Sequence, residues 1–172
     1  MAHRAMLFAP RGRGWMRAHP AGADSPAAVT VFEGLVGLGL VYRAGNYGSE
    51  PGGLGAARLL ADEFLDCLAA DLATTLSERF RFDVRLVVTE LLTNAERYAH
   101  GPSLLELEGS PRSVVVTVWD SNTALPVVFP PDPSRAGGHG LEIVNRLCVR
   151  VTVERVPVGK RIRAVLSVPG AP

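Results

Sequence analysis

The sequence predicts an α+β fold, a two-layer sandwich in which helices cover one face of a mixed, mostly antiparallel sheet. Two helical patterns follow one another in the middle of the chain, at residues 56–77 and 82–101. Segments with the character of strands lie on both sides of them, and four of these segments are close enough in sequence to form two hairpins. Strands and helices grouped in this way are typical of a sheet with helices on one face.

Length and composition are those of a globular domain. The chain has 172 residues, of which 47% are hydrophobic and 20% charged, so we expect a single domain at 29–170. A formal charge of +1 gives no reason to expect nucleic acid or an acidic membrane surface as a partner. Residues 1–28 are rich in Arg, Gly, Pro and Ala without periodicity, and we expect a disordered extension there. The two cysteines, Cys67 and Cys148, are expected to be buried free thiols, which fits a cytoplasmic protein.

The helices are predicted from apolar spacing. Residues 29–47 contain one or two strands, and a helix is expected from Ala56 to near Ser77, because leucines recur there every three or four residues. A second helix follows, and Gly101-Pro102 ends it. Its apolar stripe comprises Val84, Val87, Val88, Leu91, Leu92, Ala95 and Ala99.

The second half of the chain reads as two hairpins around a loop and a short helix. The first hairpin joins 103–109 to 113–120 through the turn at 110–112. Residues 121–138 then form a loop with four prolines, and a loop of that length in a compact domain is usually functional or disordered. A short helix follows the glycines, and two strands at 149–156 and 160–168 close the chain.

Two polar residues lie beside the apolar stripe of the second helix. Glu90 and Asn94 are four residues apart and therefore lie one turn from each other. A carboxylate and an amide oxygen in this arrangement suit Mg²⁺, which proteins hold with one or two oxygen ligands plus phosphates and water. The alternative is a solvated helix edge on which Glu90 or Thr93 pairs with Arg97.

The glycines at 137, 138 and 140 precede the short helix. They suit a phosphate cradle, because backbone N–H groups at a helix N-terminus are unpaired and attract anions. A dinucleotide fingerprint fails, since Ile143 stands where a small residue is needed and no strand directly precedes the loop. A P-loop fails as well, because Gly159-Lys160 is followed by Arg161. Simple loop flexibility before a helix is the alternative.

Asp120 ends an apolar strand and opens the long loop. A buried carboxylate there could accept a hydrogen bond from an exocyclic amine such as that of adenine. An aspartate that merely caps its own loop is the alternative.

The three motifs together resemble the Bergerat-fold (GHKL) ATP-binding family, which includes histidine kinases, gyrase-type ATPases, mismatch-repair proteins and anti-sigma factor kinases. "TELLTNAERYA" looks like the asparagine motif of that family, "VWDSN" like its adenine motif and "GGHGLEIV" like the glycine motif at the end of its lid. The resemblance covers about residues 40–168. One departure is Asn122, which stands where the family often has glycine.

The resemblance implies a role for each matching residue. Asn94 would hold Mg²⁺, Asp120 would contact the adenine amino group, and Glu90 would be the catalytic base for an incoming serine hydroxyl. The ATP-binding residues implied at the lid end, residues 121–138 being the lid, are Gly138, His139, Gly140 and Leu141. Arg97 would reach a phosphate or form a surface ion pair.

The small free-standing form, without a phospho-acceptor helix, is similar to anti-sigma factor serine/threonine kinases. This similarity implies a cytoplasmic protein that uses ATP and Mg²⁺, sequesters a sigma factor and phosphorylates an antagonist protein. Relatives are often dimers, so a homodimer is compatible with it. The alternatives are an ATP-binding module that binds a regulatory partner without phosphoryl transfer, and a plain α/β domain without nucleotide.

Overall fold

The computed structural model describes residues 17–20, 30–36, 40–47, 52–71, 75–99, 101–126 and 139–170. These residues contain a seven-stranded sheet of order β1-β2-β3-β4-β5-β7-β6 in which each neighbouring pair is antiparallel. The strands are β1 (Arg17–Pro20), β2 (Thr30–Val36), β3 (Leu40–Tyr47), β4 (Ser103–Gly109), β5 (Ser113–Asp120), β6 (Arg150–Val156) and β7 (Gly159–Ser167). The helices are α1 (Gly53–Asp71), α2 (Glu78–Tyr98) and α3 (Gly140–Leu147).

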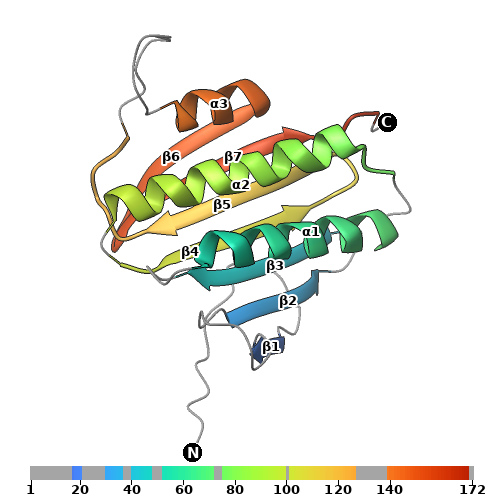
Figure 1. The fold of residues 1–172 in the computed structure, drawn as a ribbon, viewed down its shortest axis with the longest axis horizontal. Coiled ribbons are helices and arrows are strands. Elements are labelled where there is room, and N and C mark those ends of the chain that lie inside the picture. The colour runs from blue at the N-terminus through green and yellow to red at the C-terminus, as the bar shows by residue number, and fades with distance from the viewer. Residues whose placement is uncertain are drawn as a thin grey trace, which may run out of the picture.

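The helices form a second layer on one face of this sheet (Figure 1). Helix α1 packs on β3 and β4, α2 packs on β4, β5 and β7, and α3 packs on β6 and against α2. The α+β class and the one-sided helix layer are therefore confirmed. The hairpin expected at 103–120 is also confirmed, with β4 and β5 at the expected residues.

The core lies between the two layers. The apolar stripe of α2 is buried as expected, and it packs against strand residues that alternate with more exposed ones. Full burial of one such side chain contributes about 1.5–3 kcal/mol. The buried core residues of β5 and β7 include Val114, Val116, Val118, Ile162, Ala164 and Leu166.

Ser77 separates the two long helices, and the structure corrects the expected boundaries there. Helix α1 spans Gly53–Asp71, so it begins earlier and ends earlier than the spacing of its leucines suggested. Ser77, expected near the end of the first helix, is instead the N-cap of α2, with its Oγ accepting a hydrogen bond from the N–H of Phe80 at 3.2 Å. A serine in this position satisfies a backbone donor that the first helical turn leaves unpaired.

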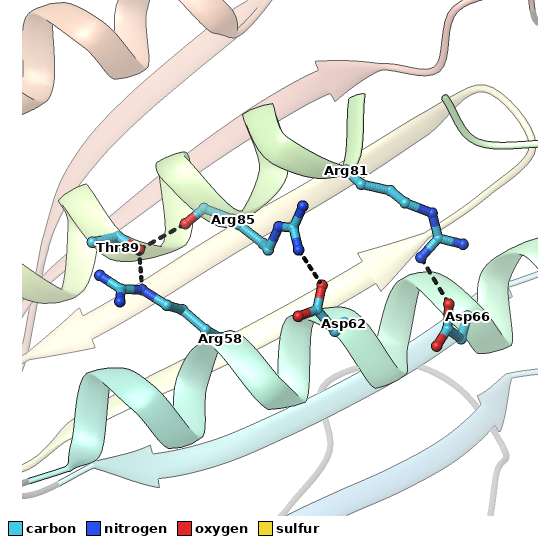
Figure 2. Close-up of polar contacts among 6 residues, drawn as sticks. All are labelled: Arg58, Asp62, Asp66, Arg81, Arg85 and Thr89. Carbon is cyan, nitrogen blue, oxygen red and sulfur yellow. Dashed lines mark hydrogen bonds and ion pairs between the residues drawn. The ribbon is translucent and has the colours of Figure 1, made fainter. Parts of the chain in front are cut away.

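A row of polar contacts fixes α2 against α1 along their solvent-facing side (Figure 2). Arg58 Nε donates to Thr89 Oγ1 at 3.1 Å. Further along the pair, Arg85 contacts Asp62 at 3.2 Å and Arg81 contacts Asp66 at 2.7 Å. Residue numbers rise along α1 as they fall along α2, so the helices are antiparallel. Exposed ion pairs contribute little energy each, and their main effect here is on the register of α2.

The N-terminal part of the chain differs from the expectation in one place. Residues 17–20 form β1, which pairs with β2, although this stretch lies in the extension expected to be disordered. Strand pairing uses backbone groups and needs no periodic side chains, so the sequence pattern did not show it. The rest of 1–28 lies outside the described residues. The expected strands in 29–47 are two, β2 and β3.

Both cysteines are free thiols and are half-buried. Burial raises the pKa of the Cys148 thiol to about 11. None of the helices within the described ranges is long and apolar enough to cross a membrane.

Candidate functional site

The ends of three elements meet at one end of the sheet, at the left of Figure 1. They are the C-terminal end of α2, the end of β5 and the start of β7. Asn122, just after β5, donates its Nδ2–H to the carbonyl of Tyr98 at 2.7 Å and so ties β5 to the last residue of α2. Asp120 and Lys160 are directly opposite each other on β5 and β7. The residues expected to carry the chemistry lie at these ends and on the facing parts of α2 and α3.

Glu90 and Gly140 are in contact. A Cβ atom added to Gly140 would lie 2.5 Å from Glu90 Oε2 and 3.6 Å from Glu90 Cβ, so the carboxylate occupies the space beside this glycine. Gly140 is the first residue of α3, where backbone N–H groups and the helix dipole favour a negative charge. The structure therefore brings the expected base on α2 to the expected glycine motif.

Asn94 lies one turn further along α2 and is half-buried. Its Nδ2 atom is buried and has no hydrogen-bond partner within the described ranges. A buried polar atom without a partner is unfavourable, and native structures usually satisfy such atoms with protein, water or ligand. Rotation of the amide by 180° exchanges oxygen and nitrogen, so this position suits either a phosphate oxygen or a cation.

Asp120 is almost completely buried at the end of β5. Its Oδ1 accepts hydrogen bonds from the backbone N–H of Asn122 and from Lys160 Nζ, both at 2.8 Å. Its Oδ2 is buried and has no partner among the residues described. Asp120 thus caps its own loop, as one interpretation of the sequence proposed, and it still keeps one acceptor oxygen for another group.

Two residues of this region were given no role from the sequence. Lys160 forms a buried ion pair with Asp120, and Asn122 binds both α2 and the loop, where its Oδ1 accepts the N–H of Ala124 at 2.9 Å. The signal for Lys160 was its place in the alternation of β7, where every second residue from 160 to 166 faces the core. A P-loop pattern involves only the neighbours of Lys160 in sequence and so does not include Asp120.

The other expected residues are less closely grouped. Arg97 is exposed in the last turn of α2, where a positive charge is favourable next to the helix C-terminus. His139 is the N-cap residue of α3, and its Nδ1 is 3.3 Å from Glu142 Oε2. Leu141 packs against the core. Gly138 lies outside the described residues, as does the lid beyond residue 126.

These residues fit a nucleotide with its metal ion. Two observations support this fit. Asn94 and Asp120 each have a buried polar atom without a partner among the described residues, and Gly140 has no side chain that would keep a ligand away from the backbone. In the parts of the chain that the structure describes, no group of three or more His, Cys, Asp or Glu side chains could hold a metal ion. A Mg²⁺ ion at Asn94 would therefore take its remaining ligands from phosphate oxygens and water, which is its usual coordination in nucleotide sites.

Comparison with known protein families agrees with a nucleotide site. Residues 49–166 match the family described as histidine kinase-like ATPase domain, and this range includes Glu90, Asn94, Asp120, Gly140 and Lys160. No curated protein matches the chain. The matched range is more than half of the sequence. The chain therefore belongs to the histidine kinase-like ATPase family.

Proposed function

We propose that the protein is an ATP-dependent serine/threonine kinase of the anti-sigma factor type, which phosphorylates an antagonist protein and sequesters a sigma factor. Membership of the histidine kinase-like ATPase family supports ATP binding and a regulatory role. The serine/threonine specificity and the two protein partners come from the resemblance to the small free-standing kinases. A sigma factor as partner would place the protein in the cytoplasm.

The observation that carries the proposal is the contact between Glu90 and Gly140. It places a carboxylate at the start of α3, where phosphates would bind, and Asn94 follows one turn later with a buried unpaired amide atom. A base for a hydroxyl nucleophile must lie within hydrogen-bond reach of the atom whose proton it takes. Glu90 is the carboxylate in contact with the glycine motif, so we assign the base to it.

Each residue has a defined task in the proposed reaction. Glu90 takes the proton of the serine hydroxyl, whose oxygen bonds to the γ-phosphorus of ATP while the bond from that phosphorus to the β–γ bridging oxygen breaks and ADP leaves. Asn94 would hold Mg²⁺, which would neutralise phosphate charge. Asp120 accepts a hydrogen bond from the adenine amino group through Oδ2. Backbone N–H groups at Gly140 approach the phosphates.

Transfer of labelled γ-phosphate to candidate antagonist proteins tests the proposal. Glu90→Gln keeps the size of the side chain and removes the base, so we expect phosphoryl transfer to fall by about a hundredfold or more with ATP still bound. Glu96→Gln removes an exposed carboxylate from the same helix and is expected to leave transfer unchanged. ATP binding without transfer to any antagonist by the unmodified protein would contradict the kinase and favour a nucleotide-dependent interaction module.

A further inference from the structure

Lys160 is the only lysine in the chain. Only 1% of its surface is exposed, whereas lysines are almost never fully buried unless they are paired. Its Nζ lies 2.8 Å from Asp120 Oδ1, and both side chains are removed from solvent. The proposed reaction assigns no task to this residue.

Stability alone gives a poor account of this ion pair. Taking two charges out of water offsets most of their attraction, and apolar residues of similar volume often serve a core as well or better. The neighbours of Lys160 on the same face of β7, Ile162 and Ala164, are apolar and fully buried. Packing therefore does not explain why a charged residue stands in that row.

The backbone just before Lys160 allows β7 to lie very close to the end of β5. Gly159 has φ +136°, a conformation that side-chain-bearing residues rarely adopt. A Cβ atom there would collide with the carbonyl oxygen of Asp120 and with the backbone of Ser121. The glycine thus lets the start of β7 lie directly on the end of β5, and this contact places Lys160 beside the Asp120 carboxylate.

The choice of lysine determines which oxygen stays free. An arginine fork usually takes both oxygens of a carboxylate, whereas an ammonium group binds as a point charge. Here Lys160 and the N–H of Asn122 both bind Oδ1, and Oδ2 is buried without a partner among the described residues. An oxygen of a carboxylate can only accept hydrogen bonds.

We propose that Lys160 is a positioning residue that holds Asp120 by Oδ1 and leaves Oδ2 to accept a hydrogen bond, so that the site selects purines with an amino group at position 6. Adenine has a donor at that position, whereas hypoxanthine and guanine have a carbonyl oxygen that an ionised carboxylate would repel. This inference rests on the proposed ATP site and adds the residue that sets its base preference.

The test compares dissociation constants for ATP and inosine triphosphate, which differ at purine position 6, measured by calorimetry on the full chain. We expect the unmodified protein to bind ATP at least about tenfold more tightly, as the loss of a hydrogen bond to a charged group implies. In Lys160→Gln the Asp120 carboxylate loses the ammonium group that holds it by Oδ1 and can turn away from the base, so the preference should fall to within about threefold. Thermal melting reports whether this variant is folded.

Arg163→Gln is the matched control, because Arg163 lies on the same strand and forms a partly exposed ion pair with Glu108 at 3.8 Å. Its ATP preference should equal that of the unmodified protein. A folded Lys160→Gln variant that keeps the original preference would overturn the role of Lys160.

A second measurement needs no variant. Labelling with ¹⁵N-lysine gives a single side-chain ammonium signal, since the chain has one lysine. We expect ATP to shift this signal more than inosine triphosphate does, and equal shifts or no shift with ATP would overturn the inference. Failure to bind ATP at all would overturn the proposed function as well. ATP binding without phosphoryl transfer would overturn only the kinase and leave the role of Lys160 standing.

Discussion

At the scale of single residues, the most informative contact is that between Glu90 and Gly140. Glu90 Oε2 lies where the first side-chain atom of residue 140 would be, so the two positions depend on each other. The crowded atom is the end of a flexible side chain and not backbone. A larger residue at 140 would therefore displace the carboxylate at little cost to the fold.

We predict that Gly140→Ala lowers phosphoryl transfer without destabilising the protein. The new methyl group pushes the Glu90 carboxylate aside, and a misplacement of about 1 Å can reduce a rate by about a hundredfold. Alanine also suits a helix better than glycine, so the free energy of unfolding should not fall. Gly55→Ala in α1 is the control, because an added Cβ there meets no atom within 4 Å. Transfer at the original rate by Gly140→Ala would contradict the assignment of Glu90.

At the scale of elements, the junction of α1 and α2 decides where Glu90 and Asn94 point. Ser77 fixes the first turn of α2, and the polar contacts of Figure 2 fix its register against α1. A shift of α2 by one residue would rotate both polar side chains about 100° around the helix, away from the end of β5.

We predict that Ser77→Ala lowers the free energy of unfolding by about 1 kcal/mol, as loss of an N-cap usually does. Ser77→Asp should retain the stability, because its carboxylate also accepts the N–H of Phe80 and is favourable at a helix N-terminus. Thr75→Ala, at an exposed position just before the cap, controls for the loss of a hydroxyl group. Urea unfolding followed by circular dichroism measures all three. Equal destabilisation by alanine and aspartate at 77 would contradict the capping role.

Elements with a strong local pattern could be predicted from the sequence, and those that depend on distant contacts could not. The stripe of α2 and the hairpin of β4 and β5 follow from spacings of two to four residues. The boundary at Ser77 was misplaced because the leucine spacing of the first helix runs on past its end. The pairing of β1 with β2 could not be predicted, because it is not accompanied by a periodic pattern of side chains.

The candidate site shows the same division. Glu90, Asn94 and Asp120 could be proposed from the sequence because each lies at a definable place in a helix or strand, and their roles stay predictions. Lys160 could not be assigned, because its partner is 40 residues away in sequence and they meet only when β7 pairs with β5. A P-loop pattern involves only the neighbours of Lys160 along the chain, whereas its relevant neighbour, Asp120, lies across the sheet.

At the scale of the whole molecule, the candidate site joins elements that are separated in the sequence. It takes Asn94 from α2, Asp120 from β5 and Gly140 from α3. A ligand that contacts all three binds the folded chain and has no equivalent site in the unfolded one. Its binding free energy therefore adds to the free energy of unfolding.

We predict that ATP with Mg²⁺ at about a hundred times its Kd raises the Tm by about 5–10 °C, from ~2.7 kcal/mol of linkage and ~2–4 °C per kcal/mol for a chain of this size. Asn94→Ala should abolish the rise, because it removes the only oxygen ligand assigned to the metal, and chelation of Mg²⁺ should reduce the rise in the unmodified protein. Asn145→Ala changes an exposed asparagine of α3 and should keep the full shift. An unchanged rise in Asn94→Ala, measured by differential scanning fluorimetry, would show that Asn94 is not the metal ligand, since the Mg²⁺ and its phosphates would then be held elsewhere in the fold.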